Sequence, residues 1–286
     1  MKESLESTDV GMEVNVWDLV SQVIESRKDS RDIIREFLSN SVAKEVVSTK
    51  IKIVSYNDPS YGPSIIFSDD CIGMYYSGNM TSPGRLDKFI SLAYGGHAGF
   101  KCDEFGYKGL GAKFAANCRR LEVKTCLKET NENYMVFVDE PLKSLRENKQ
   151  PIYKIIKGAG LLSQGTEIKV LGYEYGENSK LFIKDKLLLY LYFNTIIGHT
   201  APRTMPLISV KVEADEIVLQ PGFQYIKEPS PKNWKTYSIA TSIIKTVSRN
   251  GKSVTVTLKG GYTLETGNQD ITGLYTLKSG ACGLFL

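Results

Sequence analysis

Three short strings in a fixed order constrain the fold of this chain more than any other feature. They occupy residues 36–40, 69–74 and 106–113. The first falls within an apolar pattern of helical spacing, the second follows a short apolar strand, and the third precedes a helical segment. Each string alone is weak evidence. Their order requires a fold that brings a helix face, a strand end and a glycine-rich loop together.

Glu36 and Asn40 are four residues apart in the helix that we predict to begin at residues 29–30 and to end near residue 47. Side chains at this spacing project from the same face, here at the edge of the apolar stripe. A carboxylate there can polarise a water, and an amide oxygen one turn later can help to hold a hydrated magnesium ion. The alternative is an ordinary amphipathic helix with a solvated Glu and Asn. Taken alone, the two residues are explained better by this alternative.

Asp69 follows the apolar residues 65–67 and is separated from them by Ser68. A carboxylate at a strand end that faces a pocket can accept a hydrogen bond from the amino group of adenine. Gly73 would let the chain pass close beneath the ring, where a side chain would intrude. A polar turn that closes the strand explains the same residues equally well.

Gly106, Gly109 and Gly111 precede a predicted helix that runs to about residue 118. Backbone amides free of side chains suit anionic phosphates, and Lys108 and Lys113 could add charge. The alternative is a flexible loop and helix cap. The string matches neither the Walker phosphate loop nor the dinucleotide fingerprint.

Thr166 opens a predicted strand and could offer its hydroxyl to a base or to a bound water, although strand propensity alone accounts for it. His97 and His199 have no ligand partners at metal spacing and are predicted to be surface residues. The five cysteines form no C-x-x-C pair, which argues against structural zinc and favours reduced thiols in a cytosolic protein.

The bulk properties indicate an ordinary globular protein of 286 residues, with 42% hydrophobic and 24% charged residues. A net charge of +4 neither favours nor excludes nucleic acid. Charged residues interrupt the most apolar stretch, 181–198, and the first nine residues are polar. We therefore predict no membrane span and no signal peptide, and a cytoplasmic location.

The pattern of elements predicts an α+β fold with a boundary near residue 205. The expected helices cover 16–27, 30–47 and 182–197, and residues 74–105 form a glycine-rich flap. The strands expected before the boundary cover 48–56, 64–68, 121–126, 134–138, 153–156 and 167–171. Only strands are expected after it: 207–212, 215–219, 238–247, 252–258 and 271–277, with a hairpin turn at Asn250 and Gly251. The chain ends in a strand, so we expect a longer protein.

The ordered set resembles the Bergerat-fold (GHKL) ATPases, a superfamily that includes DNA gyrase B, the ninety-kilodalton heat-shock chaperone, MutL, sensor histidine kinases and the microrchidia ATPases. The resemblance covers roughly residues 16 to 200. It implies an α/β sandwich whose mixed, mostly antiparallel sheet is covered by helices on one face. It also implies that residues 206–286 are an incomplete, β-rich, transducer-like segment after an ATP-binding domain at 1–205.

The resemblance also implies roles for the strings. Glu36 would be the general base for a slow magnesium-dependent ATPase, and Asn40 would hold Mg²⁺. Asp69 would recognise adenine, with Gly73 beneath it. The remaining nucleotide-binding residues would be Met74, Gly106, Lys108, Gly109, Leu110, Gly111, Lys113 and Thr166.

Two departures from the family's pattern point to slow turnover. Ala43 stands where many members carry Asp, and Cys71 replaces the first glycine of the family's Asp-x-Gly-x-Gly motif, which residues 69–73 resemble. One expectation is an ATPase whose flap closure and homodimerisation gate a larger DNA-processing or remodelling machine. A second is a nucleotide sensor with negligible hydrolysis that recruits a protein partner. A third is a structural or interaction protein in which the three strings occur by chance. The lysine that would contact the γ-phosphate stays open among Lys227, Lys245, Lys252, Lys259 and Lys278.

Overall fold

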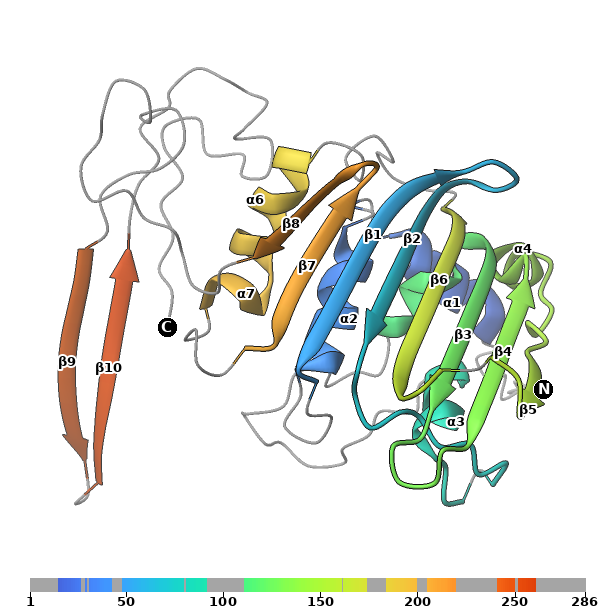
Figure 1. The fold of residues 1–286 in the computed structure, drawn as a ribbon, viewed down its shortest axis with the longest axis horizontal. Coiled ribbons are helices and arrows are strands. Elements are labelled where there is room, and N and C mark those ends of the chain that lie inside the picture. Colours follow the sequence, from blue (N-terminus) through green and yellow to red (C-terminus); the bar gives the residue numbers. More distant parts are fainter. Residues whose placement is uncertain are drawn as a thin grey trace, which may run out of the picture.

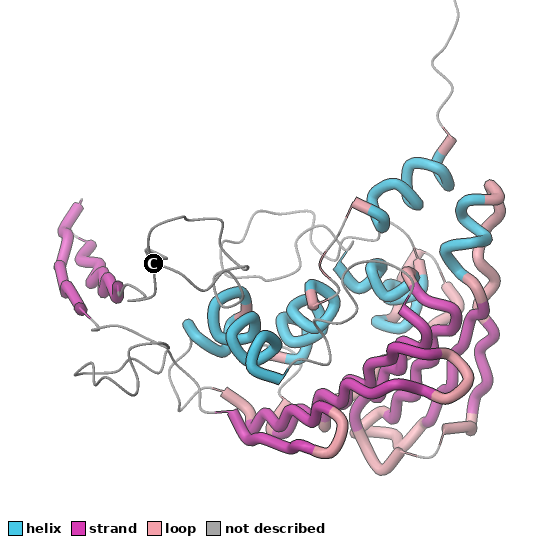
Figure 2. The backbone as a smooth tube through the Cα atoms, turned by 90° about the horizontal axis from the view of Figure 1, so that it is seen from above, coloured by secondary structure: helices cyan, strands magenta, loops and turns pink. Residues whose placement is uncertain are grey.

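The computed structural model describes residues 15–26, 29, 31–42, 48–79, 81–91, 111–160, 162–173, 184–199, 205–219, 241–249 and 252–260. These residues form an α+β sandwich in which helices cover one face of an eight-stranded sheet (Figures 1 and 2). The fold class predicted from the sequence is therefore confirmed.

The strands of this sheet are β1 Lys50–Asp58, β2 Gly62–Asp69, β3 Cys118–Cys126, β4 Asn133–Asp139, β5 Lys154–Lys157, β6 Gly165–Tyr173, β7 Leu207–Val212 and β8 Asp215–Leu219. Their order across the sheet is β5-β4-β3-β6-β2-β1-β7-β8. All neighbouring strands are antiparallel except β1 and β7, which are parallel. Strands β3, β6 and β2 therefore lie side by side at the centre, although β4 and β5 separate β3 from β6 in the sequence.

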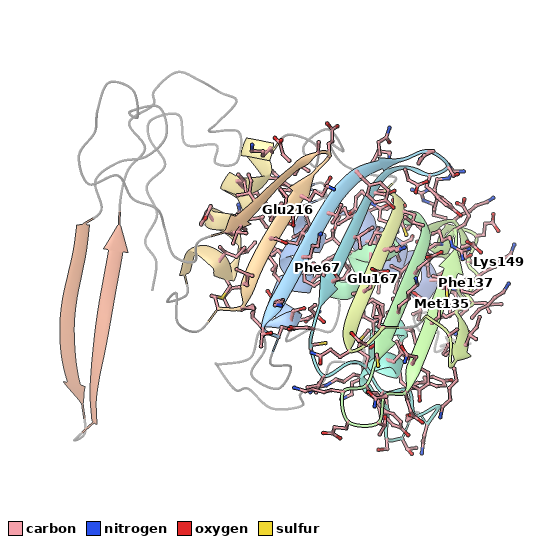
Figure 3. The ribbon with its side chains drawn as sticks, in the orientation of Figure 1. Phe67, Met135, Phe137, Lys149, Glu167 and Glu216 are labelled. Atoms are coloured by element: carbon pink, nitrogen blue, oxygen red, sulfur yellow. The ribbon has the colours of Figure 1, made fainter. Side chains whose placement is uncertain are left out.

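The two faces of the sheet differ because side chains alternate along each strand. On β3, Leu121 and Val123 are buried beneath the helices, while Lys124 lies on the other face. That open face carries ion pairs between neighbouring side chains, such as Lys124 with Glu167 at 3.9 Å. Figure 3 shows Glu167, Glu216 and Phe137 on the strands, in front of the helices.

The helix α2 packs an apolar face against the sheet. Its residues Ile33, Ile34, Phe37 and Leu38 are buried, and the Phe37 ring lies 5.4 Å from that of Phe67 on β2. The helices are α1 Val16–Glu25, α2 Asp32–Ser41, α3 Arg85–Ile90, the 3-10 helix η1 Gly111–Ala116, α4 Pro141–Arg146, α6 Lys184–Asn194 and α7 Ile196–His199. None of the helices in the described ranges is long and apolar enough to span a bilayer.

The single helix predicted at 182–197 is interrupted at Thr195, between α6 and α7. The Thr195 hydroxyl donates to the carbonyl of Leu191, and the amide of Ile197 donates to the Thr195 oxygen at 3.3 Å. A threonine side chain that bonds the backbone in this way competes with the helical pattern.

The sheet continues beyond the domain boundary predicted near residue 205. Strand β7 pairs in parallel with β1, from Lys50 opposite Leu207 to Ser55 opposite Val212, and β8 pairs with β7. Apolar side chains of β7 and β8 join the same core, while the predicted domain boundary near residue 205 stays a prediction. Strands β9 Thr241–Arg249 and β10 Lys252–Gly260 form a separate two-stranded sheet. The predicted turn at 250–251 and strand at 271–277 lie outside the described residues.

The first part of the predicted flap, 74–79 and 81–91, is organised around the buried carboxylate of Asp87. This group accepts hydrogen bonds from the amide of Ser77 at 2.7 Å and its hydroxyl at 3.0 Å, and from the amides of Gly78 and Gly84 at 3.1 and 2.9 Å. Burial would raise the pKa of Asp87, but these donors hold it below its ordinary value. These bonds tie Ser77 and Gly78, near the start of the predicted flap, to the N-terminus of α3.

An Asp87→Asn variant is expected to lose about 1–3 kcal/mol of unfolding free energy at pH 7, because an amide group cannot accept all of these bonds. The lowered pKa of Asp87 means that its stabilisation exists above the unfolded pKa and disappears as pH falls through the folded pKa. Urea midpoints of variant and wild type should therefore differ at pH 7, and the difference should shrink as the pH falls through the folded pKa of Asp87. Asp215→Asn, at an exposed side chain, is the control, and an equal loss there would contradict this assignment.

Candidate functional site

Three central strands bring polar side chains together at one end of the sheet. Asp69 is the last residue of β2 and pairs with Thr166 on β6. Thr166 pairs in turn with Thr125 on β3. The strand register alone therefore places a carboxylate and two hydroxyl groups in one row, at the strand end where the sequence predicts recognition of a base.

The carboxylate of Asp69 is surrounded by neutral donors. The Ser41 hydroxyl donates to Oδ2, and the Cys71 amide donates to Oδ1 at 3.3 Å. Burial raises the pKa of Asp69 above its ordinary value, and the hydrogen bonds from Cys71 and Ser41 offset only part of this effect. Each oxygen has two acceptor positions, so this carboxylate can accept a further donor from a ligand.

Ser41 also joins the first string to the second, because it is the last residue of α2. The same helix carries Glu36, whose side chain is 20% exposed, and the exposed Asn40. The contact of Ser41 with Asp69 thus holds the helix that carries Glu36 and Asn40 at the end of β2. The helix that carries the first string therefore contacts the end of the strand that carries the second.

The thiol of Cys71 belongs to the same cluster. Its sulfur lies 3.5 Å from the Thr166 Oγ1 atom, which is 3.1 Å from Thr125 Oγ1. The Met74 amide donates to Thr125 Oγ1 at 2.7 Å. Burial raises the pKa of Cys71 to about 12, so the thiol is protonated at neutral pH. Where the resemblance leads one to expect glycine, this chain places a small, buried side chain that packs into the site.

Asp70, the second acid of the pair, has a different role. Its carboxylate accepts the amides of Thr49 and Lys50 at 2.7 and 2.8 Å, together with the Thr49 hydroxyl. Partial burial would raise its pKa, but these bonds hold the pKa below its ordinary value. Asp70 therefore fixes the start of β1 against the end of β2.

Gly73 is required by the fold itself. It has φ = +80°, and a Cβ built there would lie 2.2 Å from the carbonyl oxygen of Cys126. The sequence predicts a glycine here because a base would pass close to the chain. The structure supplies a second reason, which is contact with the end of β3. Gly165 is packed in the same way, since its Cβ would lie 2.0 Å from the Asp69 carbonyl oxygen.

A Gly73→Ala variant is expected to lose about 3–5 kcal/mol of unfolding free energy, from an unfavourable φ together with the clash. Gly158→Ala is a matched control, because Gly158 also has φ = +80° but a Cβ added there would have no atom within 4 Å. That variant should lose only about 1–2 kcal/mol. Chemical denaturation of both measures the difference, and equal losses would mean that the Cys126 contact is relieved without cost.

The third string is described only in part. Gly106, Lys108, Gly109 and Leu110 lie outside the described residues, as does Ala43, so their predicted roles stay predictions. Gly111 begins the 3-10 helix η1, which packs against α2. This contact places the end of the string beside the helix that carries the first.

Lys113 of η1 is buried instead of extending toward solvent. Its Nζ donates to the carbonyl of Lys88 at 3.0 Å and to that of Phe89, both on α3. Burial lowers the pKa of Lys113 to about 7. The sequence predicts that the Lys113 amino group contacts phosphates, but it donates instead to backbone carbonyls of α3, within the predicted flap.

Ser41 and Thr125 belong to this cluster but were not predicted as site residues from the sequence. Both had a local signal. Ser41 follows the buried face of α2 at the spacing of Phe37 and Leu38, and Thr125 continues the buried alternation of Leu121 and Val123. A polar residue at the end of an apolar pattern is a candidate for a buried hydrogen bond.

The comparisons with known proteins give limited results. No family model matches the chain, and no curated protein matches its sequence. Among solved structures, it is similar to the ATP-binding domain of topoisomerase IV from Francisella tularensis, in a complex with a small-molecule inhibitor. The two share 17% sequence identity with a TM-score of 0.48, over 84% of this chain and 61% of the other. A likeness of this size assigns neither a family nor a function.

Proposed function

We propose that this chain is an ATP-binding module that hydrolyses ATP slowly. The observation that carries the proposal is the hydrogen bond from Ser41 to Asp69. It joins the helix of Glu36 and Asn40 to the buried carboxylate of β2, as a single site built from the first two strings would require.

Asp69 would distinguish adenine from guanine. A carboxylate accepts a hydrogen bond from the 6-amino group of adenine, whereas the 6-oxo group of guanine would place one acceptor against another. The surroundings of Asp69 suit this contact, because a neutral hydroxyl and a backbone amide donate to its carboxylate, which is largely desolvated. Thr166 would lie on the same side of the base.

Asn40 would contribute one oxygen to Mg²⁺. Among the described residues, no group of three His, Cys, Asp or Glu side chains is placed to hold a metal ion. An exposed amide oxygen suits a magnesium ion that keeps its waters and takes its other ligands from nucleotide phosphates. Glu36 would accept a proton from the attacking water as ATP and water give ADP and phosphate, while Gly106, Gly109 and Gly111 would bind the phosphates.

The proposal extends to closure of the flap at 74–105 and to nucleotide-dependent dimerisation, through which the module would gate a larger DNA-processing or remodelling machine. Its support is the resemblance of the ordered strings. A nucleotide sensor with negligible hydrolysis is the second candidate. It is favoured by the buried thiol of Cys71, which lies 3.5 Å from Thr166 Oγ1 where the resemblance leads one to expect glycine.

Calorimetric titration with Mg-ATP and Mg-GTP, combined with a phosphate-release assay, tests the proposal. We expect ATP to bind, GTP to bind at least about tenfold more weakly, and phosphate to appear slowly. Binding without release over hours would favour the sensor. If ATP, ADP and a non-hydrolysable analogue neither bind nor raise the melting temperature, the proposal is wrong, because a ligand of the folded state must stabilise it.

A further inference from the structure

We propose that Arg35 is a positioning residue for Glu36, and that the helix α6 holds Arg35 in place through Tyr190 and Asp32. This inference rests on the proposed function, in which Glu36 is the general base. It adds a residue that neither the strings nor the resemblance identified, and it connects the base to an element distant in the sequence.

The guanidinium of Arg35 bridges two carboxylates on α2. Its Nη2 lies 3.1 Å from Glu36 Oε1, and its Nη1 lies 3.2 Å from Asp32 Oδ1. Because a guanidinium is planar and rigid, fixing one nitrogen also fixes the direction in which the other points. The position of Asp32 therefore determines where Arg35 can hold the Glu36 carboxylate.

Asp32 is itself fixed from α6. The hydroxyl of the buried Tyr190 donates to Asp32 Oδ1 at 2.5 Å, the same oxygen that contacts Arg35. The Tyr190 ring is held on its face by Arg31, whose guanidinium carbon lies 4.5 Å from the ring centroid. Burial, with Asp32 beside it, raises the pKa of Tyr190, so the hydroxyl remains a donor at neutral pH.

These contacts form one connected series: Tyr190 on α6, then Asp32, Arg35 and Glu36 on α2. The side chains of Arg35, Asp32 and Glu36 are 28%, 14% and 20% exposed, so water competes with the ion pairs and their effect on stability is small. Their effect on geometry can be larger, because a small displacement of a catalytic group costs much of its rate. A shift of α6 would release Asp32 and, through Arg35, the base.

The test compares Arg35→Gln in the wild-type and Glu36→Gln backgrounds, by single-turnover hydrolysis of radiolabelled ATP and by calorimetric ATP affinity. In the wild type we expect a fall in turnover of about tenfold with unchanged affinity. In the Glu36→Gln background we expect no further fall, because Arg35 acts only through that carboxylate. Tyr190→Phe, which keeps the ring and removes the hydroxyl, should lower turnover in the same direction by about threefold.

The control is Arg146→Gln, an arginine that bonds Glu25 of α1 at 2.6 Å and should leave turnover unchanged. Equal falls from Arg35→Gln in both backgrounds, or no fall in the wild type, would overturn the inference while leaving ATP hydrolysis intact. If ATP does not bind, or Glu36→Gln turns over as fast as wild type, the proposed function itself fails and the inference fails with it.

Discussion

An Asp69→Asn variant is expected to lose ATP affinity by roughly 10- to 100-fold, the range for a hydrogen bond to a charged acceptor. The reason is local. The carboxylate already accepts from Ser41 and from the Cys71 amide. An asparagine side chain has one oxygen and one NH₂ group. If its oxygen faces the Cys71 amide, its NH₂ group faces the adenine amino group, so two donors meet. If it is turned the other way, the NH₂ group faces the Cys71 amide, and again two donors meet. Calorimetric titration with Mg-ATP measures the loss.

Asp70→Asn is the matched control, because it changes the neighbouring residue in the same way. Asp70 bonds Thr49 and Lys50 at the start of β1, so the variant should lower the urea midpoint and keep ATP affinity within about twofold of wild type. Unchanged affinity in Asp69→Asn would show that Asp69 does not contact the base. Equal losses in both variants would attribute the effect to the fold.

A Glu36→Gln variant is expected to lose about 10²- to 10⁴-fold in phosphate release, the range for removal of a general base. The amide keeps the size of the side chain and the contact with Arg35 but cannot accept a proton from water. ATP affinity should change little, because the proposed contact with adenine is made by Asp69 on β2 and not by Glu36 on α2. A phosphate-release assay at saturating ATP gives the turnover.

Glu25→Gln on α1 is the control for Glu36, since Glu25 bonds Arg146 and lies on a different helix. It should leave turnover unchanged. Wild-type turnover in Glu36→Gln would exclude Glu36 as the base. A matching loss of ATP affinity in Glu36→Gln would instead indicate that the residue supports binding.

Local patterns predicted most of the described elements. The alternation of apolar residues located β3, β4 and β6 within a few residues, because burial of one sheet face leaves a period of two in the sequence. The short helix α4 was missed, since it offers one turn of pattern after Pro141. The second helix predicted to reach residue 47 is described as α2 only to Ser41.

The same patterns placed parts of the candidate site. Helical spacing alone puts Glu36 and Asn40 on neighbouring turns of one helix, and the apolar run 65–67 puts Asp69 at a strand end. Each of these inferences concerns residues a few positions apart, where backbone geometry fixes the relation.

Contacts between distant segments were decided by tertiary structure. The hydrogen bond of Ser41 to Asp69, the packing of Gly73 on Cys126 and the burial of Lys113 against α3 all join residues far apart in the chain. So does the parallel pairing of β7 with β1, which adds residues 207–212 to the sheet. Periodicity shows that a face is buried, but only packing determines which segment covers it, because many apolar partners satisfy the same pattern.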